Sequence, residues 1–255
     1  MAAVVQWLER QIVVLNVAGS NPVSRPIFQM SERRIVMENT NFSKGEKIQF
    51  GGCDWRVLDV QNNKVLILSD VILGKQFYHN KHDFVTWADC DLRKLLNEKF
   101  YDFFSPAEKA RIVDTTVETI DNPRFGTSGG VATVDKIFLL SIDEAVLYFG
   151  DSGQMQNGCS KGIRPFDECI SDQYNEVRIA QDYYDAGIYM WWRDGGFNSA
   201  WWLRSPGGHG TCTAFVDYNG EIRLFGDSSI PEYRPSDDGQ NVQLGIRPAL
   251  WLSVE

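Results

Sequence analysis

Two neighbouring apolar runs, separated by polar residues, occupy residues 53–73, CDWRVLDVQNNKVLILSDVIL. Both runs are rich in β-branched residues, which are typical of strands. They meet at Asn62-Asn63, and asparagine tolerates the positive φ of a tight hairpin turn. The pattern therefore predicts a β-hairpin.

The spacing changes to a helical one in residues 91–104, DLRKLLNEKFYDFF, where the large apolar side chains fall mostly on one face. Ser105-Pro106-Ala107-Glu108 combines a capping-box serine and glutamate with proline at the first helical position, which predicts a second helix through Ile112. Ser141-Ile142-Asp143-Glu144 repeats the capping box before AVLYF, and Gly150 is expected to end that helix in the left-handed conformation.

Residues 136–141, KIFLLS, predict a strand that leads into the third helix, and residues 151–178 are polar enough to predict a surface loop. Beyond them the chain becomes aromatic and β-like in AGIYMWWRD, SAWWLRS, TAFVDYNGEIRLF and GIRPALWLSV. Asn219-Gly220 is its strongest hairpin signal. Strands, then helices, then strands favour an α+β fold over an alternating parallel sheet, and residues 37–255 contain no linker, so we expect a single domain.

Residues 1–36 do not fit that domain. Glu9 and Arg10 interrupt the apolar segment and no positive cluster precedes it, so a signal peptide is the less favoured interpretation. The string GSNPVSRP resembles a transfer-RNA gene read as protein, because the T-arm sequence translates in one frame to Gly-Ser-Asn-Pro. We expect an over-extended gene start, with Met30 or Met37 as the natural initiator, and poor packing of this segment on the rest.

Composition supports a folded protein with a real core: 255 residues, 43% hydrophobic and 13% aromatic. The formal net charge is -9. Such an acidic surface repels phosphate backbones, so nucleic acid is not an expected partner. No apolar run approaches the ~18 residues that cross a bilayer, so we expect no membrane insertion and a soluble protein, cytoplasmic rather than secreted.

Candidate chemistry is sparse. The five cysteines form no CxxC pair, which argues against a zinc knuckle or a dense disulfide framework and favours reduced thiols; they are Cys53, Cys90, Cys159, Cys169 and Cys212. His79 and His82 are expected at the surface. The aspartates lack EF-hand spacing and the sugar-binding calcium signature of animal lectins, and common catalytic motifs are missing. We predict no metal and no cofactor.

Six segments in order resemble a bacterial and phage domain family of uncharacterised function with a C-type-lectin-like fold: FGGCDWRVLDV, TWADCDLRKLLNEKFY, FSPAEKARI, DKIFLLSIDEA, SAWWLRSPG and GIRPALWL. The resemblance runs from about Gly45 to Leu252. Some members of that family are variable proteins of diversity-generating retroelements, and the wider fold includes the formylglycine-generating enzymes. The resemblance implies small antiparallel sheets flanked by short helices, paired N- and C-terminal strands, and a loop-rich face near the C-terminus that binds a partner.

The resemblance also implies a division between scaffold and displayed residues. The scaffold would include Trp201, Trp202, Arg204, Arg247 and Trp251. Retroelement mutagenesis acts on adenines, typically in AAC codons, so displayed positions hold residues that NNC codons encode. The candidates of this kind are Gly208, His209, Gly210, Thr211, Cys212, Asp217, Tyr218, Arg223, Phe225, Asp227 and Ser228.

We therefore expect a non-enzymatic module that binds a macromolecule, either a protein or a surface glycan. Outward rings of Trp191-Trp192 and Trp201-Trp202, joined by Tyr183, Tyr184, Tyr189 and Tyr218, could form an aromatic platform; a packed sheet face is the alternative. Exchange of residues 208–212 is expected to change partner choice and to leave stability within about 0.5 kcal/mol.

Two further alternatives stay open. The first is an oxidoreductase of the formylglycine-generating type, which requires an accessible, low-pKa thiol at Cys212 or Cys169. The second is a structural module of a phage or cell-surface assembly, with an oligomer interface over the aromatic strands. Arg204 and Arg247 are expected to bond loop carbonyls or a carboxylate, with a direct ligand clamp as the rival role.

Overall fold

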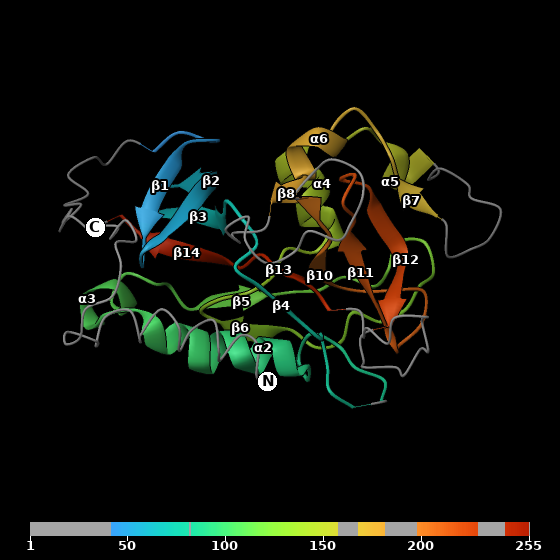
Figure 1. Cartoon of the computed structure of the whole chain (residues 1–255), viewed down its shortest axis with the longest axis horizontal. Coiled ribbons are helices and arrows are strands. Elements are labelled where there is room, and N and C mark those ends of the chain that lie inside the picture. The colour runs from blue at the N-terminus through green and yellow to red at the C-terminus, as the bar shows by residue number, and fades with distance from the viewer. Residues whose placement is uncertain (1–41, 82, 158–167, 182–197, 229–242, 255) are drawn as a thin grey trace, which may run out of the picture.

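The computed structural model describes residues 42–81, 83–157, 168–181, 198–228 and 243–254 (Figure 1). The fold is α+β, with mostly antiparallel sheets and short helices, as the sequence predicts. Two sheets lie at opposite ends of the view, and a helical segment runs beneath them. The proposed extension 1–36 lies outside the described residues. So do His82, Cys159, Trp191, Trp192 and the tyrosines Tyr183, Tyr184 and Tyr189.

The first sheet has four antiparallel strands in the order β1-β2-β3-β14. They are β1 (Lys47–Phe50), β2 (Cys53–Gln61), β3 (Lys64–Ser69) and β14 (Ala249–Ser253). The predicted hairpin at Asn62-Asn63 is confirmed, since it joins β2 to β3. The pairing expected of the terminal strands needs a correction. The last strand joins the N-terminal sheet, but its partner is β3, and β1 lies at the opposite edge.

The second sheet has six strands in the order β4-β13-β10-β11-β12-β7. They are β4 (Gly74–Gln76), β13 (Leu244–Ile246), β10 (Trp201–Pro206), β11 (Cys212–Val216), β12 (Ile222–Ser228) and β7 (Cys169–Ile170). Only the β10–β13 pair is parallel among the pairings described in this sheet. The hairpin predicted at Asn219-Gly220 is confirmed between β11 and β12, with Gly220 at φ 79°.

Two small two-stranded sheets complete the β structure. One pairs β5 (Thr115–Val117) with β6 (Thr133–Asp135), and the other pairs β8 (Ala180–Gln181) with β9 (Asn198–Ser199). In Figure 1 the β5–β6 pair lies between the helical segment and the larger sheets.

The helix predicted for residues 91–104 is present as a continuous helical segment. It consists of α2 (Asp91–Leu95), a π-helical turn η1 (Leu96–Phe100) and a 3₁₀ turn η2 (Tyr101–Phe103). At the π-helical turn, Asn97 bonds a segment that lies far away in the sequence. Its side-chain amide donates to the Ile137 carbonyl at 2.8 Å, and its side-chain oxygen accepts from the Lys136 amide at 2.8 Å. A π-helical turn departs from the regular hydrogen-bond pattern of an α-helix. The bonds from Asn97 to the neighbouring segment stabilise the widened turn.

Both predicted capping boxes are confirmed. Ser105 caps α3 (Pro106–Lys109) and Ser141 caps α4 (Ile142–Phe149), each with reciprocal bonds to the glutamate three residues on. Gly150 ends α4 with a positive φ of 130°, but its ψ of 136° is extended, so the expected left-handed stop is wrong.

Residues 137–141 are buried, but the stretch 136–141 forms one isolated bridge, between Phe138 and Ala249, where a strand was expected. The stretch expected to be a surface loop contains short elements, namely α5 (Gln154–Asn157), β7 and α6 (Asn175–Arg178). Its end is anchored, because the Arg178 side chain is completely buried and donates to the Gly220 carbonyl at 2.8 Å.

One hydrophobic core extends through both large sheets, and Trp55, Trp87, Trp201 and Trp202 are its largest buried side chains. The outward ring expected from the Trp201-Trp202 pair is therefore wrong, since neither ring is exposed. The cause is that β10 is an inner strand with both faces covered. Phe149 of α4 packs against Trp201, while Tyr78 packs against Trp202. Strands covered on both faces bury consecutive side chains.

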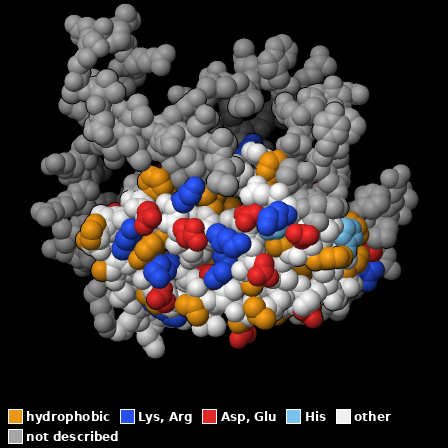
Figure 2. Space-filling view, turned by 90° about the horizontal axis from the view of Figure 1, so that it is seen from below, with side chains coloured by type: hydrophobic (Ala, Val, Ile, Leu, Met, Phe, Trp, Pro, Cys, Tyr) orange, Lys and Arg blue, Asp and Glu red, His pale blue; other side chains and the backbone are white. Residues whose placement is uncertain are grey.

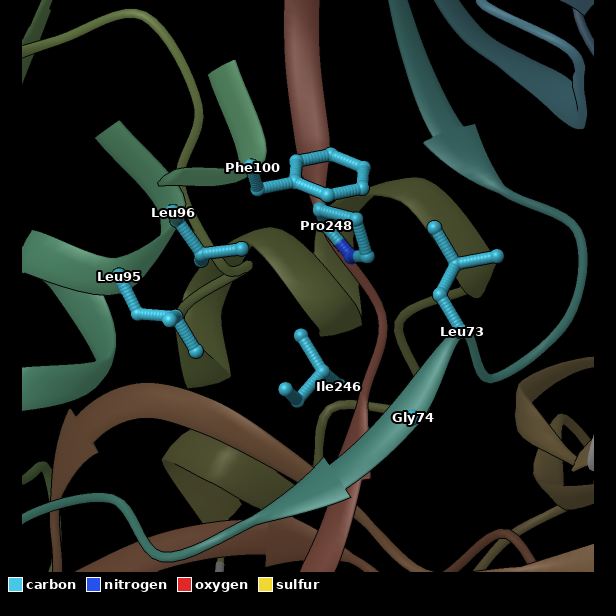
Figure 3. Close-up of a pocket in the computed structure, with 7 residues that line it drawn as sticks. All are labelled: Leu73, Gly74, Leu95, Leu96, Phe100, Ile246 and Pro248. Atoms are coloured by element: carbon cyan, nitrogen blue, oxygen red, sulfur yellow. The ribbon is translucent and has the colours of Figure 1, made fainter. Parts of the chain in front are cut away.

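A small apolar cavity lies where β4, the helical segment and the chain between β13 and β14 meet (Figure 3). The side chains of Leu95, Leu96, Phe100 and Ile246 point toward one another across it. Its volume is about 20 Å³, and ligand pockets typically measure about 300–1,000 Å³. This cavity is a packing defect between layers.

The face below the sheets carries interspersed charges of both signs (Figure 2). Ion pairs such as Lys109–Asp102 at 3.0 Å and Lys136–Asp114 at 2.7 Å lie on the helical segment and beside it. Exposed mixed charges of this kind are typical of a solvated surface. Among the described residues, no helix is long and apolar enough to span a membrane.

Candidate functional site

The eleven candidate display residues fall into two groups at opposite ends of the β11–β12 hairpin. Residues 208–212 precede or begin β11, and Phe225, Asp227 and Ser228 lie in the second half of β12 beside them. Asp217, Tyr218 and Arg223 lie at the other end, around the turn. Four residue steps along β11 separate the two ends by about 13 Å. The candidates therefore do not form one surface patch around a single loop.

The group at the Asn219-Gly220 turn is mainly structural. Asp217 is only 4% exposed, and its carboxylate accepts from the amides of Asn219 at 2.9 Å and Glu221 at 3.0 Å. It also accepts from Nε of Arg223 at 2.8 Å. The expectation that Asp217 is displayed is wrong, because its carboxylate closes the turn. Tyr218, by contrast, is 61% exposed.

The other group belongs to a tight turn between β10 and β11. The Gly207 amide donates to the Cys212 carbonyl at 2.7 Å, and the Cys212 amide donates to the His209 carbonyl at 2.9 Å. His209 is exposed at the tip, whereas Gly208, Gly210 and Thr211 are half-buried. Cys212 is only 8% exposed because β11 begins there. The expectation that Cys212 is fully displayed is therefore wrong.

Four aromatic or imidazole rings surround this turn, and we call the residues Phe84, Phe125, His209, Gly210 and Phe225 the aromatic face. The Phe84 ring lies directly over Gly210 and is 82% exposed. The Phe225 ring makes edge contacts with His209 and with Phe125, each at a centroid distance of 5.5 Å. Three segments far apart in the sequence therefore meet in one partly exposed aromatic surface.

Asn122 bonds the backbone beside the aromatic face, a role that the sequence does not predict. Its buried side-chain amide donates to the carbonyls of Pro206 at 2.8 Å and Leu224 at 2.9 Å. Its side-chain oxygen accepts from the amides of Arg124 at 2.9 Å and Phe125 at 3.0 Å. Asn-Pro at 122–123 signals a turn, but nothing local indicates the two carbonyls on distant strands.

The scaffold residues are buried as expected. Arg204 is 2% exposed and donates to the carbonyls of Leu139 at 2.7 Å and Glu118 at 2.8 Å, and it pairs with the Glu144 carboxylate. These contacts show the structural role that the sequence predicted for it. Trp251 is buried in β14, where the Lys64 ammonium lies 4.4 Å from the centre of its ring.

Arg247 is also buried, and it donates from Nε to the Ser69 carbonyl at 2.8 Å. Its guanidinium lies 5.1 Å from the centre of the Trp201 ring and 5.5 Å from that of Phe149. Burial lowers the pKa of Arg247 to about 9. The Arg247 side chain therefore holds the connection from β13 to β14 in place, with its guanidinium next to two aromatic rings.

A family model matches residues 62–254, from the turn of the first hairpin to the end of β14. The chain belongs to the DUF6273 family, described as a domain of unknown function. The match includes all eleven candidate residues, the whole aromatic face and the scaffold residues. Searches of curated proteins and of solved structures found no match.

The thiols described in this DUF6273 protein are mostly unsuited to nucleophilic chemistry. Burial, together with nearby carboxylates, raises the pKa of Cys53 and of Cys169 to about 11. Burial also raises the pKa of Cys90, to about 12. Such groups stay protonated at neutral pH, and the thiolate is the reactive form. Cys169 therefore lacks the low pKa that the oxidoreductase alternative requires.

The expectation that His79 lies at the surface is wrong. The residue is 7% exposed, and its Nδ1 lies 3.0 Å from the Asp91 carboxylate. Among the described residues, no three histidine, cysteine or acidic side chains lie close enough together to hold a metal ion.

Substitution by alanine is expected to affect stability differently at two glycines of the turn, Gly208 and Gly210. A Cβ on Gly208 would lie 2.3 Å from the Phe225 ring, which other rings hold in place. A Cβ on Gly210 would meet the Phe84 ring at 2.0 Å, but that ring can swing into solvent. We expect Gly208→Ala to lower the free energy of unfolding by about 1–3 kcal/mol. For Gly210→Ala we expect a change within about 0.5 kcal/mol.

Urea denaturation of the two variants beside the unmodified chain measures this difference. Equal effects of the two substitutions would contradict the packing of the turn. The expected tolerance of residues 208–212 to exchange, within about 0.5 kcal/mol, therefore stays a prediction for Gly210, whereas the nearby Phe225 ring argues against it at Gly208.

Proposed function

We propose that the DUF6273 domain is a non-enzymatic recognition module in which a C-type-lectin-like scaffold presents the aromatic face to a macromolecular partner, a protein or a surface glycan. The observation that carries the proposal is the Phe84 ring, 82% exposed and seated on the backbone of Gly210. A single exposed apolar side chain is common, but a contiguous exposed apolar patch is typical of an interaction site. Phe84 belongs to such a patch, because the aromatic face also includes the rings of Phe125 and Phe225. Rigid aromatic anchors are also the residues that contribute most to interface affinity.

The layer beneath the aromatic face supports the same function. The buried side chain of Asn122 donates to the carbonyls of Pro206 and Leu224, next to the turn and to Phe225. A recognition surface held by buried, hydrogen-bonded residues loses little conformational freedom on binding, which favours affinity. The partner would meet the rings of Phe125 and Phe225, which pack on each other, and the exposed ring of Phe84 beside them.

The finer proposal is that this domain is the variable protein of a diversity-generating retroelement. Packing or bonding roles remove Gly208, Cys212, Asp217, Arg223 and Phe225 from the positions that could vary freely. The candidates left are His209, Gly210, Thr211, Tyr218 and Asp227, and the Ser228 side chain lies outside the described residues. The test is genomic: a neighbouring reverse transcriptase gene and a near-copy of the 3′ coding region that differs at adenines. A locus with neither would exclude the retroelement assignment and leave the recognition function standing.

Removal of the Phe84 ring should reduce partner binding. Because hot-spot aromatics contribute about 2 kcal/mol or more, we expect Phe84→Ala to weaken binding by roughly 30-fold. The matched control is Phe103→Ala, which removes a 45% exposed phenylalanine from the helical segment, away from the aromatic face. Both rings are exposed, so unfolding free energies should change little, by about 0.5 kcal/mol.

Binding can be measured with a glycan array and with capture of proteins from lysate, using the unmodified chain, Phe84→Ala and Phe103→Ala in parallel. The informative ligands are those that both the unmodified chain and the control retain and Phe84→Ala loses. If every retained ligand binds all three proteins equally, the aromatic face is not the recognition surface.

A further inference from the structure

The turn that precedes β11 places a thiol, an imidazole and a hydroxyl in a row. Sγ of Cys212 lies 3.6 Å from Nε2 of His209. Nδ1 of the same ring lies 2.8 Å from Oγ1 of Thr211. The bond from the Cys212 amide to the His209 carbonyl fixes this geometry, because it closes the turn and returns the cysteine to the histidine.

These contacts have the relationship of a nucleophile, a base and a group that orients the base. In one imidazole tautomer, Nδ1–H donates to the Thr211 hydroxyl and Nε2 accepts the proton of the Cys212 thiol. Both contacts are then satisfied at once. The Phe225 ring, in edge contact with the imidazole, restricts its rotation on a second side.

The surroundings of Cys212 differ from those of three other described cysteines. Cys169 lies 3.8 Å from the Glu221 carboxylate, and carboxylates also act on Cys53, so negative charge opposes ionisation of both thiols. Cys90 is fully buried at the start of α2. Cys212 instead faces an imidazole that is exposed to solvent. An imidazole can take up the thiol proton, and a carboxylate beside the thiol disfavours its loss.

We propose that Cys212 is an imidazole-activated thiol and a site of reversible modification by low-molecular-weight disulfides. His209 takes the proton of the thiol, and the Cys212 thiolate attacks one sulfur of the disulfide. The S–S bond of that molecule breaks while a mixed disulfide forms on Cys212. The departing thiolate receives the proton that His209 holds, so Cys212 is oxidised and the small disulfide is reduced.

The backbone around the turn favours this exchange over acyl transfer. An acyl-transfer site needs amide donors directed at a developing oxyanion. Here the amides of Gly207, Gly208 and Cys212 already donate to the carbonyls of Cys212, Phe225 and His209. Disulfide exchange needs no oxyanion site, because the charge passes between sulfur atoms. The inference does not depend on the recognition function, although modification would take place beside the aromatic face.

The test uses the whole chain and 2-hydroxyethyl disulfide, a neutral probe that the acidic protein does not repel. After timed exposure at pH 7 and quenching, peptide mass spectrometry gives the extent of mixed-disulfide formation at each cysteine. We expect Cys212 to react at least about ten-fold faster than Cys53 and Cys169, because thiolate character sets the rate. His209→Gln should slow Cys212 by about ten-fold and leave the other two rates unchanged. Dithiothreitol should reverse the modification.

Access and activation can be separated in this design. Glutamine at position 209 leaves Cys212 at least as exposed, so a slower reaction reports the loss of the base. Equal rates at Cys212 and Cys53 would overturn the proposal, and so would a fast Cys212 that His209→Gln leaves unchanged. Should His209→Gln fail to fold, Thr211→Val keeps the ring but removes its orienting partner. It is expected to slow Cys212 alone, and an unchanged rate in that variant would equally overturn the proposal.

Discussion

Replacement of Arg204 by methionine should lower the free energy of unfolding by about 3–5 kcal/mol, because several groups bonded to the buried guanidinium lose their partner at once. The guanidinium bonds four groups, which lie in three parts of the chain. It donates to the carbonyls of Glu118 and Leu139 and to the Thr119 hydroxyl, and it pairs with Glu144 at the start of α4. Methionine has a similar length but no donors, so the buried carbonyls would lose their partners.

Urea denaturation followed by tryptophan fluorescence measures this loss. Arg204→Lys should recover little of it, because a single ammonium cannot reproduce the guanidinium's several directed bonds. The matched control is Lys109→Met, which removes a cation from the exposed pair with Asp102, worth about 0–1 kcal/mol. Equal losses for Arg204→Met and Lys109→Met would contradict the view that Arg204 holds the scaffold together.

The parts of the fold that the sequence predicts are those set by neighbouring residues. The capping boxes at Ser105 and Ser141 and the turns at Asn62-Asn63 and Asn219-Gly220 lie where the patterns place them. In each, a side chain or a permissive backbone acts on residues within four positions, so the signal and its effect share one short window. The α+β class follows from the order of these windows.

The errors arise where distant segments decide the outcome. Adjacent tryptophans on a strand predict one ring inside and one outside, but Trp201 and Trp202 are both covered because β10 has neighbours on both faces. The π-helical turn at Leu96–Phe100 depends on bonds from Asn97 to residues 136 and 137. No pattern within the helix itself indicates those partners.

The candidate site shows the same division. The codon argument selects residues by type and carries no information on burial. It therefore selects Asp217, whose carboxylate is buried and bonded, as well as Tyr218, whose ring is exposed. It also omits Phe84 and Phe125, which reach the turn from segments more than 80 residues earlier in the chain. The sequence therefore predicts the turn at the centre of the site, whereas its aromatic surroundings follow only from the tertiary structure.

Asn122 offers the sharpest test of how that surface is supported. Asn122→Leu keeps the volume but removes the donor to Pro206 and Leu224 and the acceptor for Arg124 and Phe125. Because buried groups left without partners each cost about 1–3 kcal/mol, we expect a loss of about 2–4 kcal/mol in unfolding free energy. The matched control is Gln156→Leu, which removes a side-chain amide from an exposed position in α5.

Asn122→Asp adds a pH dependence whose sign follows from the same contacts. An aspartate here keeps an acceptor for the amides of residues 124 and 125, but its second oxygen faces the Pro206 and Leu224 carbonyls. Ionisation is then disfavoured in the folded state, so its pKa lies above the ordinary value of about 3.9. The deficit relative to the unmodified chain should be full above the raised pKa and should shrink as pH falls toward the unfolded value. If Asn122→Asp is as stable as the unmodified chain at pH 7, no hydrogen-bond donor is needed at position 122. Ring packing alone would then hold the aromatic face in place.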